Sequence, residues 1–294
     1  MDRRALEEAP TREAGPLLLT PGERIAGSYQ VCSLIGQGGM SQVFEAEDLG
    51  LRRRVAIKVN IADPDGLELQ REGQALSAVR HPGLPVVHGL GQHKGFPYLV
   101  MERLYGVSLE EDLRRASAGG RPFPLGDALD ILIAVADVLG EVHRAGLAHR
   151  DVKPGNLMLC PRGRVVLLDF GIFQAEIQVS NTEVCGTPRY MAPELITREV
   201  EPGQGHLLDT YAFGAVACEL LIGRPPFDSS NFVEILELHL GGALPDLGRA
   251  RPDAPPELIS LVTACLAKAA DDRPPSMDEL AAELRVLARR LVHR

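Results

Sequence analysis

A group of polar residues in the middle of the chain has the types and spacing for chemistry on a metal-bound phosphate. The segment 149–156 reads HRDVKPGN, and DFG follows at 169–171 after two short apolar runs. Asp151 can orient a hydroxyl group and accept its proton, and Lys153 can neutralise charge on a phosphoryl group in transfer. Asn156 and Asp169 carry the hard oxygen atoms that Mg²⁺ prefers. A polar loop with helix caps would explain each residue separately, but not their joint spacing.

Lys58 is a second candidate, because the chain has only four lysines and this one lies in the apolar, alternating run RRVAIKVN at 53–60. A buried lysine needs an anion, and a nucleotide phosphate or a carboxylate would serve. Glu72, in the next predicted helix, is the candidate carboxylate, and Glu68 is the alternative. The competing interpretation is an edge-strand lysine whose ammonium group reaches solvent.

Glycines dominate the turn GQGGMSQV at 36–43, between two strand-like runs. Such a turn can approach phosphate oxygens closely and point backbone N–H groups at them. An ordinary hairpin turn explains the same glycines. A dinucleotide-binding fingerprint does not fit, because a strand and not a helix follows the turn.

Composition excludes several classes of protein. The chain has 294 residues, 45% of them hydrophobic, and a net charge of −9, which excludes a wholly disordered chain and a general nucleic-acid binder. Its five cysteines are spread widely without a C-x-x-C pair, which predicts neither a zinc site nor a disulfide framework and favours the reducing cytoplasm. Acidic residues interrupt every long apolar run, so we expect no membrane span.

The pattern along the chain predicts an α+β protein with two unequal lobes. Residues 1–27 read as a flexible tail. Alternating runs predict strands at 29–35, 42–48, 53–60, 86–90, 97–104, 157–159 and 165–168. Helical periodicity predicts helices at 67–79, 125–145, 207–222, 232–240, 256–267 and 276–291. We therefore expect a small β-rich lobe with one main helix and a hinge over 28–104, and a larger helical lobe over 105–294, with 28–290 forming one domain.

These elements, in this order, resemble the signature of the eukaryotic-like Ser/Thr protein kinases of the bacterial type. The matches are the glycine-rich turn, VAIK at 55–58, HRDVKPGN, DFG, APE at 192–194, the Asp209-x-Tyr211-x-x-Gly214 pattern and Arg273. They run from Ile35 to Arg273 and so cover most of the chain. The resemblance implies a bilobal protein-kinase fold and a non-specific serine/threonine protein kinase activity on protein substrates.

The resemblance also assigns roles to individual residues. It implies that Asp151 is the catalytic base, assisted by Lys153 and Lys58, and that Asn156 and Asp169 hold Mg²⁺, or Mn²⁺, on ATP. Implied ATP-binding residues are Ile35, Gly36, Gln37, Gly38, Gly39, Met40, Ser41, Gln42, Val43, Ala56, Lys58, Glu72, Met101, Glu102, Leu104 and Met158. Implied structural residues are Phe170, Gly171, Glu194, Asp209 and Arg273, with Leu76, Val87, His149 and Phe170 stacked as a spine.

Regulation is expected in the segment between DFG and APE. Arg150 precedes the implied catalytic base, an arrangement that usually needs a negative partner from this segment. The segment offers Ser180, Thr182, Glu183 and Thr187. Our hypothesis is that Glu183 partly replaces a phosphate and that phosphorylation of Thr182 adds to the activity.

Some positions depart from the family pattern. Ser41 replaces the third glycine of the turn, and the interval from Lys58 to Glu72 is short, which suggests a tightly tethered helix. Gly155 stands where some basic-directed kinases carry a glutamate that binds substrate arginine, and Glu219 is a partial substitute.

Two other classes remain open at this point: a pseudokinase that senses nucleotide, and a small-molecule phosphotransferase with the same fold. The kinase interpretation implies autophosphorylation and a place in signal transduction. Nothing in the sequence supports dimerisation through the smaller lobe.

Overall fold

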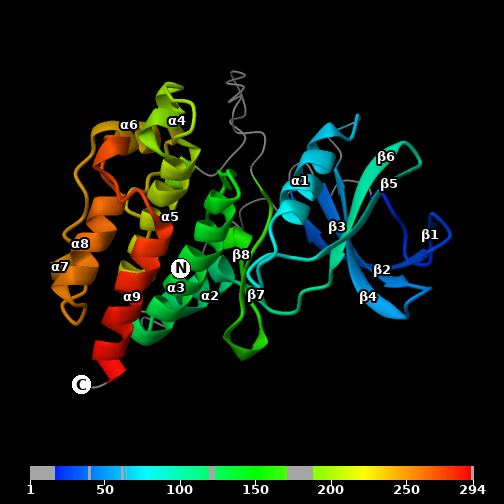
Figure 1. Cartoon of the computed structure of the whole chain (residues 1–294), viewed down its shortest axis with the longest axis horizontal. Coiled ribbons are helices and arrows are strands. Elements are labelled where there is room, and N and C mark those ends of the chain that lie inside the picture. Colours follow the sequence, from blue (N-terminus) through cyan, green and yellow to red (C-terminus); the bar gives the residue numbers. More distant parts are fainter. Residues whose placement is uncertain are drawn as a thin grey trace, which may run out of the picture.

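The computed structural model describes residues 17–38, 41–60, 63, 65–118, 123–170 and 188–292. Two lobes lie side by side, one built mainly of strands and the other mainly of helices (Figure 1). We call residues 17–104 the small lobe and residues 105–292 the large lobe, within these described ranges. The arrangement agrees with the predicted α+β class.

A six-stranded antiparallel sheet forms the small lobe, with strand order β1-β2-β3-β4-β6-β5. Its strands are β1 (Arg24–Ile25), β2 (Tyr29–Gln37), β3 (Ser41–Asp48), β4 (Arg53–Asn60), β5 (Val87–His93) and β6 (Phe96–Glu102). Helix α1 (Leu67–Ala78) packs against β5 and β6. The sheet therefore supports the helix that is packed beside it.

Side-chain alternation gives the sheet two different faces. On β4, Val55, Ile57 and Val59 belong to an outer core, together with Phe44 of β3 and Val100 of β6. The residues between them on β4 point to the opposite face, toward α1 and the large lobe. Lys58 lies on that inner face for this reason.

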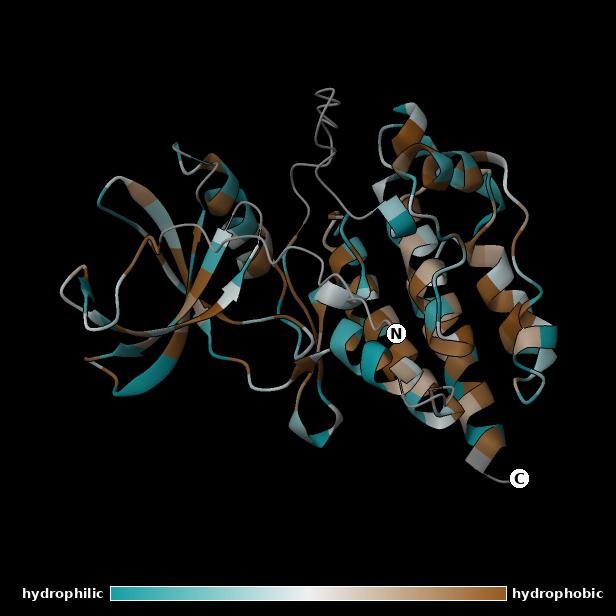
Figure 2. Ribbon diagram, turned by 180° about the vertical axis from the view of Figure 1, so that it is seen from behind, coloured by the Kyte–Doolittle hydropathy of each residue, from teal (hydrophilic) through white to brown (hydrophobic). Residues whose placement is uncertain are grey.

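The main core of the protein runs through both lobes. Ala56, Leu76 and Leu99 of the small lobe belong to the same buried cluster as Leu132 and Tyr211 of the large lobe. In Figure 2 the central helices of the large lobe are strongly hydrophobic, as buried helices should be.

The large lobe begins with a small sheet, β7-β8-β9, and continues in helices. Its strands are β7 (Val107–Ser108), β8 (Leu157–Leu159) and β9 (Val165–Leu167). Its α-helices are α2 (Leu109–Ala118), α3 (Leu125–Arg144), α4 (Pro193–Thr197), α5 (Gly205–Ile222), α6 (Phe232–Gly241), α7 (Leu247–Ala250), α8 (Pro256–Cys265) and α9 (Met277–Val292). The 3-10 turns are η1 (Pro154–Asn156), η2 (Pro161–Gly163), η3 (Pro188–Tyr190) and η4 (Ala270–Asp272). Helix α3 packs on both α5 and α9, and these three form the centre of the lobe.

Helix α5 is long and apolar enough to cross a bilayer by length and composition, but 78% of its 18-residue window is buried inside the protein. A buried core helix passes the same test, so we assign α5 to the core. No other helix in the described part of the chain meets that criterion.

The predicted tail is wrong over its described part, residues 17–27. Leu19 and Ile25 are buried in the outer core, and the short strand β1 pairs with β2. The Leu18 N–H also donates to the Gln42 side chain of β3 at 3.0 Å. Prolines and glycines suppressed any periodic pattern here, so the two apolar anchors could not be recognised as part of an element.

Candidate active site

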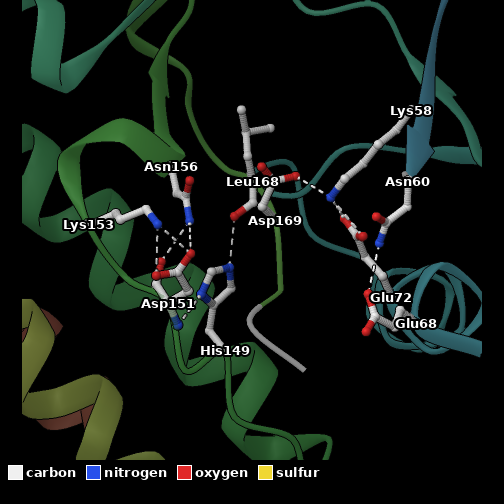
Figure 3. A network of polar contacts seen from close by, with 10 residues as sticks. All are labelled: Lys58, Asn60, Glu68, Glu72, His149, Asp151, Lys153, Asn156, Leu168 and Asp169. Atoms are coloured by element: carbon white, nitrogen blue, oxygen red, sulfur yellow. Dashed lines mark hydrogen bonds and ion pairs between the residues drawn. The ribbon is translucent and has the colours of Figure 1, made fainter. Parts of the chain in front are cut away.

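Lys58 binds two carboxylates that come from different lobes (Figure 3). Its Nζ lies 2.8 Å from both carboxylate oxygens of Glu72 on α1, and 2.8 Å from Asp169 Oδ1, which follows β9. The edge-strand interpretation therefore fails, because Lys58 is 8% exposed and its ammonium group is paired. This lysine links β4, α1 and the loop after β9 into one unit.

Glu72, and not Glu68, is the partner of Lys58. Glu68 instead accepts a hydrogen bond of 2.8 Å from the Asn60 amide (Figure 3). Asp63 accepts a bond of 3.0 Å from the Leu69 N–H in the first turn of α1. Hydrogen bonds therefore hold the short connection between β4 and α1 at two points, and this connection keeps the Glu72 side chain toward Lys58.

The electrostatics of this triad favour a charged lysine. Burial alone would lower the pKa of Lys58, but the Asp169 and Glu72 carboxylates outweigh burial and raise the pKa above its usual value. Burial also raises the pKa of Asp169, yet the Lys58 charge and hydrogen bond dominate and the net pKa is lowered. Asp169 stays ionised, as a metal ligand must be.

A second cluster surrounds Asp151. The Lys153 ammonium lies 2.7 and 3.0 Å from the two carboxylate oxygens of Asp151. The Asn156 amide nitrogen donates to Asp151 Oδ2 at 2.7 Å and to the Asp151 carbonyl at 2.9 Å. Because that nitrogen faces Asp151, the Asn156 amide oxygen is the atom available to a cation.

The donor set fits a hard divalent cation that also binds phosphate oxygens. Asn156 and Asp169 offer one amide and one carboxylate, too few to retain a cation without a further ligand. Among the described residues no group of three or more His, Cys, Asp or Glu is placed to hold a metal. The site therefore suits a cation that arrives with a nucleotide better than a resident structural metal.

Asp209 of α5 fixes the backbone of the loop that carries Asp151. Its carboxylate accepts the N–H groups of His149 at 2.7 Å and Arg150 at 2.6 Å, and it bonds His143 Nε2 at 2.8 Å. Arg150 has a φ of 66° and Asp169 a φ of 52°, both in the left-handed region. Residues with side chains hold such angles only where the surroundings impose them.

His149 connects the loop that carries Asp151 with the segment that carries Asp169. Its Nε2 lies 3.0 Å from the Leu168 carbonyl, and its ring lies 4.7 Å from that of Phe170. Burial lowers the pKa of His149, so the ring is neutral at pH 7. Of the other residues predicted as a spine, Leu76 and Phe170 belong to the main core and Val87 packs against that core, while His149 contacts Phe170.

The predicted adenine-binding residues lie on the inner face of the small lobe, at its exit, and on β8 of the large lobe. Ala56 of β4 is paired with Met101 of β6. Val43 packs against the main core, and Met158 lies on β8. Glu102 ends β6, and Leu104 is buried just beyond it.

The glycine-rich turn connects β2 and β3. Gly36 is paired with Val43, and the Gly38 N–H donates to the Ser41 carbonyl at 2.8 Å. Ile35 is exposed and lies at an irregularity of β2, between Leu34, which pairs with Phe44, and Gly36. Gln37 is exposed.

Gln42 belongs to the predicted nucleotide-binding set, which stays a prediction, but its side chain lies on the outer face of the sheet. Its side chain is fully buried and accepts from Leu18 on the outer face. Strand alternation explains this, because Gln42 is next to inward-facing Val43 and shares a face with Phe44. Only its backbone can face a nucleotide.

Glu194 and Arg273, both implied as structural residues, are paired in the large lobe. Arg273 is fully buried at its side chain and binds Glu194 through two bonds of 2.7 and 2.8 Å. Glu219 accepts a bond of 2.5 Å from the Tyr190 hydroxyl. A Cβ atom on Gly155 would lie 3.7 Å from a Glu110 carboxylate oxygen, so α2 places an acid beside the position that lacks one.

Several predicted residues lie outside the described part of the chain. They are Gly39, Met40, Gly171, Ser180, Thr182, Glu183 and Thr187. The hypothesis on Glu183 and Thr182 therefore stays a prediction. Arg150, their expected partner, has its guanidinium near Gly205 at the start of α5.

Sequence reasoning missed three side chains that organise the site: Asn60, His143 and Arg164. Asn60 and His143 each bind a carboxylate that the sequence did single out, so their partners gave the only signal. Arg164 binds Glu102 through two hydrogen bonds. It lies in a turn with no motif of its own.

The fold and this site define a class, and comparison with known proteins identifies it. Residues 29–284 match the model of the family described as "Protein kinase domain". The chain therefore belongs to the protein kinase domain family, with the bilobal fold of that family.

Among similar curated proteins, the probable serine/threonine-protein kinase pknA2 of Bifidobacterium longum is 33% identical over 282 residues, 92% of this chain and 36% of that protein. PrkC of Bacillus subtilis is 32% identical, over 90% of this chain and 41% of that protein. PknA of Mycobacterium tuberculosis is 36% identical, over 84% and 58%. The chain thus spans about a third to three fifths of the length of these relatives.

A solved structure titled "PpkA-294 apo form" superposes with a TM-score of 0.76 and 27% identity, and the match covers 90% of this chain and 98% of that one. This likeness agrees with the family assignment and with the described arrangement of the two lobes.

Proposed function

We propose that this chain is a serine/threonine protein kinase that transfers the γ-phosphoryl group of ATP to hydroxyl groups of protein substrates. The observation that carries the proposal is the meeting of two clusters, Lys58–Glu72–Asp169 and Asp151–Lys153–Asn156, on either side of Leu168 (Figure 3). One cluster suits a nucleotide phosphate and its cation, and the other suits an attacking hydroxyl group. The serine/threonine kinases among the relatives support the same activity.

In this mechanism Lys58 binds the α- and β-phosphates and Glu72 keeps its ammonium group in place. Asn156 and Asp169 would hold Mg²⁺, which neutralises charge on the phosphate oxygens when it is bound. Asp151 orients the substrate hydroxyl and accepts its proton. Lys153, already 2.7 Å from Asp151, stabilises the negative charge that builds up on the transferred group.

The wider proposal covers autophosphorylation, signalling and a cytoplasmic location. The four described cysteines are free, which suits a reducing compartment. We also propose that the kinase domain spans residues 17–290 and not 28–290, because the segment before Ser28 contributes to the outer core.

The test is phosphoryl transfer from radiolabelled Mg-ATP to the protein itself and to a peptide mixture, followed by phosphoamino-acid analysis. We expect phosphoserine and phosphothreonine, and a loss of about 100-fold or more in Asp151→Asn, because the variant cannot accept the proton. Asp130→Asn is the matched control, since Asp130 is exposed on α3, and it should keep full activity.

The other classes give different outcomes. A pseudokinase would bind ATP without transferring phosphate in any of the three proteins. A small-molecule phosphotransferase would leave the protein and the peptides unlabelled but would transfer phosphate to small alcohols. Either result would contradict the proposal.

A further inference from the structure

Arg164 connects the hairpin β8–β9 of the large lobe with the end of β6 in the small lobe. Its Nη1 and Nη2 atoms donate to the two carboxylate oxygens of Glu102 at 2.6 and 3.0 Å. Its Nε donates to the Pro82 carbonyl at 2.7 Å, in the segment before β5. All three nitrogens of the guanidinium group are therefore used, each with good geometry for a charge-assisted bond.

Glu102 holds this contact at a defined place in the sheet. It is paired with Val55 of β4, and its N–H donates to the Val86 carbonyl at 2.8 Å. Next to Pro82, the Gly83 carbonyl accepts the N–H of Leu167 on β9 at 2.8 Å. The hairpin is thus attached to the small lobe at Leu167 as well as at Arg164, and Arg164 supplies the side-chain part of the attachment.

The same hairpin carries a wall of the predicted adenine pocket. Met158 lies on β8, paired with Val166 of β9. Glu102 and Leu104 belong to the predicted hinge at the exit of β6, whose backbone is expected to read the edge of the adenine ring. The position of Met158 relative to the hinge decides whether an adenine ring that rests on Met158 also reaches the hinge backbone. The Arg164–Glu102 pair joins the two elements that carry these groups.

We propose that Arg164 is a positioning residue for nucleotide binding, which holds the hairpin that carries Met158 at the correct spacing from the hinge at Glu102. This inference rests on the proposed function. Arg164 acts through Glu102 and Met158 and has no part in the chemical step.

A purely structural role would give a different pattern of effects. The Arg164 and Glu102 side chains are 33% and 27% exposed, and ion pairs with this access to solvent add little to the free energy of unfolding. The main effect of losing the pair should therefore fall on the affinity for the adenine end of the nucleotide.

The experiment compares Arg164→Gln and Arg164→Lys with Arg162→Gln. Arg162 is the matched control, because it lies exposed in the same turn, two residues earlier. We expect Arg164→Gln to raise the KM for ATP about tenfold with kcat within about twofold of wild type, since the chemical groups are untouched. The KM for ATP of Arg164→Lys should lie between those of wild type and Arg164→Gln, because an ammonium group cannot bind both carboxylate oxygens of Glu102 as the planar guanidinium group does. Arg162→Gln should match wild type.

Two binding measurements separate positioning from stability. The affinity for Mg-tripolyphosphate, which lacks adenine, should stay unchanged in Arg164→Gln, while the affinity for Mg-ATP falls. In a double-mutant cycle with Glu102→Gln, the two changes should be coupled in ATP affinity. Thermal unfolding monitors the integrity of every variant.

Three results would overturn the inference: an unchanged affinity for ATP in Arg164→Gln, an equal loss for ATP and tripolyphosphate, or no coupling with Glu102→Gln. A wild-type protein that binds neither ligand would instead contradict the proposed function itself. The two failures are thus distinguishable.

Discussion

Lys58 is the residue on which the two lobes converge, because its single ammonium group is shared by Glu72 and Asp169. Two carboxylates around one buried cation leave a net negative charge, which a cation or a further positive group must balance. A Mg²⁺ ion on Asp169 would supply this balance, and Lys58 could then turn toward the phosphates. Glu72 must therefore hold the Lys58 ammonium group in place once Asp169 binds the cation.

This dependence predicts a difference between two glutamates on one helix. Glu72→Gln should lower kcat/KM for ATP by about 10- to 100-fold, because the amide cannot hold the ammonium group electrostatically. Glu68→Gln should stay within about threefold of wild type, since the amide oxygen still accepts from Asn60. Steady-state kinetics of both variants, with Gln70→Ala as an exposed control on the same turn, checks this. Equal losses in the two variants would show that Lys58 does not depend on Glu72.

At this scale the sequence predicted well which residues take part in the site, and less well which way their side chains point. The pairs Lys58–Glu72 and Glu194–Arg273 could be expected because each joins two charges within a known order of motifs. Gln42 could not be placed, since a one-residue change of face depends on strand register. Arg164 could not be found either, because its partner is 62 positions away and neither residue belongs to a charge pattern.

At the scale of elements, alternation and periodicity predicted most of the strands and long helices within a few residues. Short elements such as β1, β7 and α4 were missed, because each is defined by its partners and not by its own pattern. Helix α6 is held in place by contacts with other elements. Its residue His239 is fully buried, lies 2.8 Å from the Tyr211 hydroxyl of α5 through Nδ1, and meets the Phe227 ring edge-on at 4.9 Å.

The packing of α6 on α5 should therefore weaken in acid. Burial, together with the nearby Lys268 ammonium group, lowers the pKa of His239 to about 4, against 6.5 for an unperturbed histidine. As the pH falls from about 6.5 toward 4, the unfolded chain takes up this proton before the folded one, so the contribution of His239 to stability is complete above that range and is lost within it.

The measurement is thermal unfolding across this pH range for wild type and His239→Asn. Asparagine can still bond to Tyr211 but does not titrate, so the variant should be less stable at neutral pH and lose stability less steeply in acid. Identical slopes for the two proteins would show that His239 does not control this acid response.

At the scale of the whole molecule, the two hydrophobic cores have different roles. The main core extends from α1 and β4 into α3 and α5, so it joins the lobes on the side of the site. The outer core lies on the far face of the sheet and includes Leu19 and Ile25, from the segment that the sequence suggested was a tail. The sheet is thus covered on both faces, and β4 is held in the register that turns Lys58 inward.

If this segment is a part of the folded small lobe, two of its three leucines, Leu17 and Leu19, should respond differently to truncation. Leu19 is 2% exposed and Leu17 is 46% exposed, only two residues apart. Leu19→Ala should lower the free energy of unfolding by about 2–4 kcal/mol, through lost burial and a cavity, whereas Leu17→Ala should change it by less than about 0.5 kcal/mol. In a domain of this size the first change corresponds to a fall in Tm of roughly 5–15 °C. Denaturant unfolding and calorimetry of the two variants measure the difference, and a chain that begins at Ser28 should be destabilised at least as much as Leu19→Ala. Equal stability of both variants and of the shortened chain would return residues 17–27 to the status of a tail and place the start of the domain at Ser28.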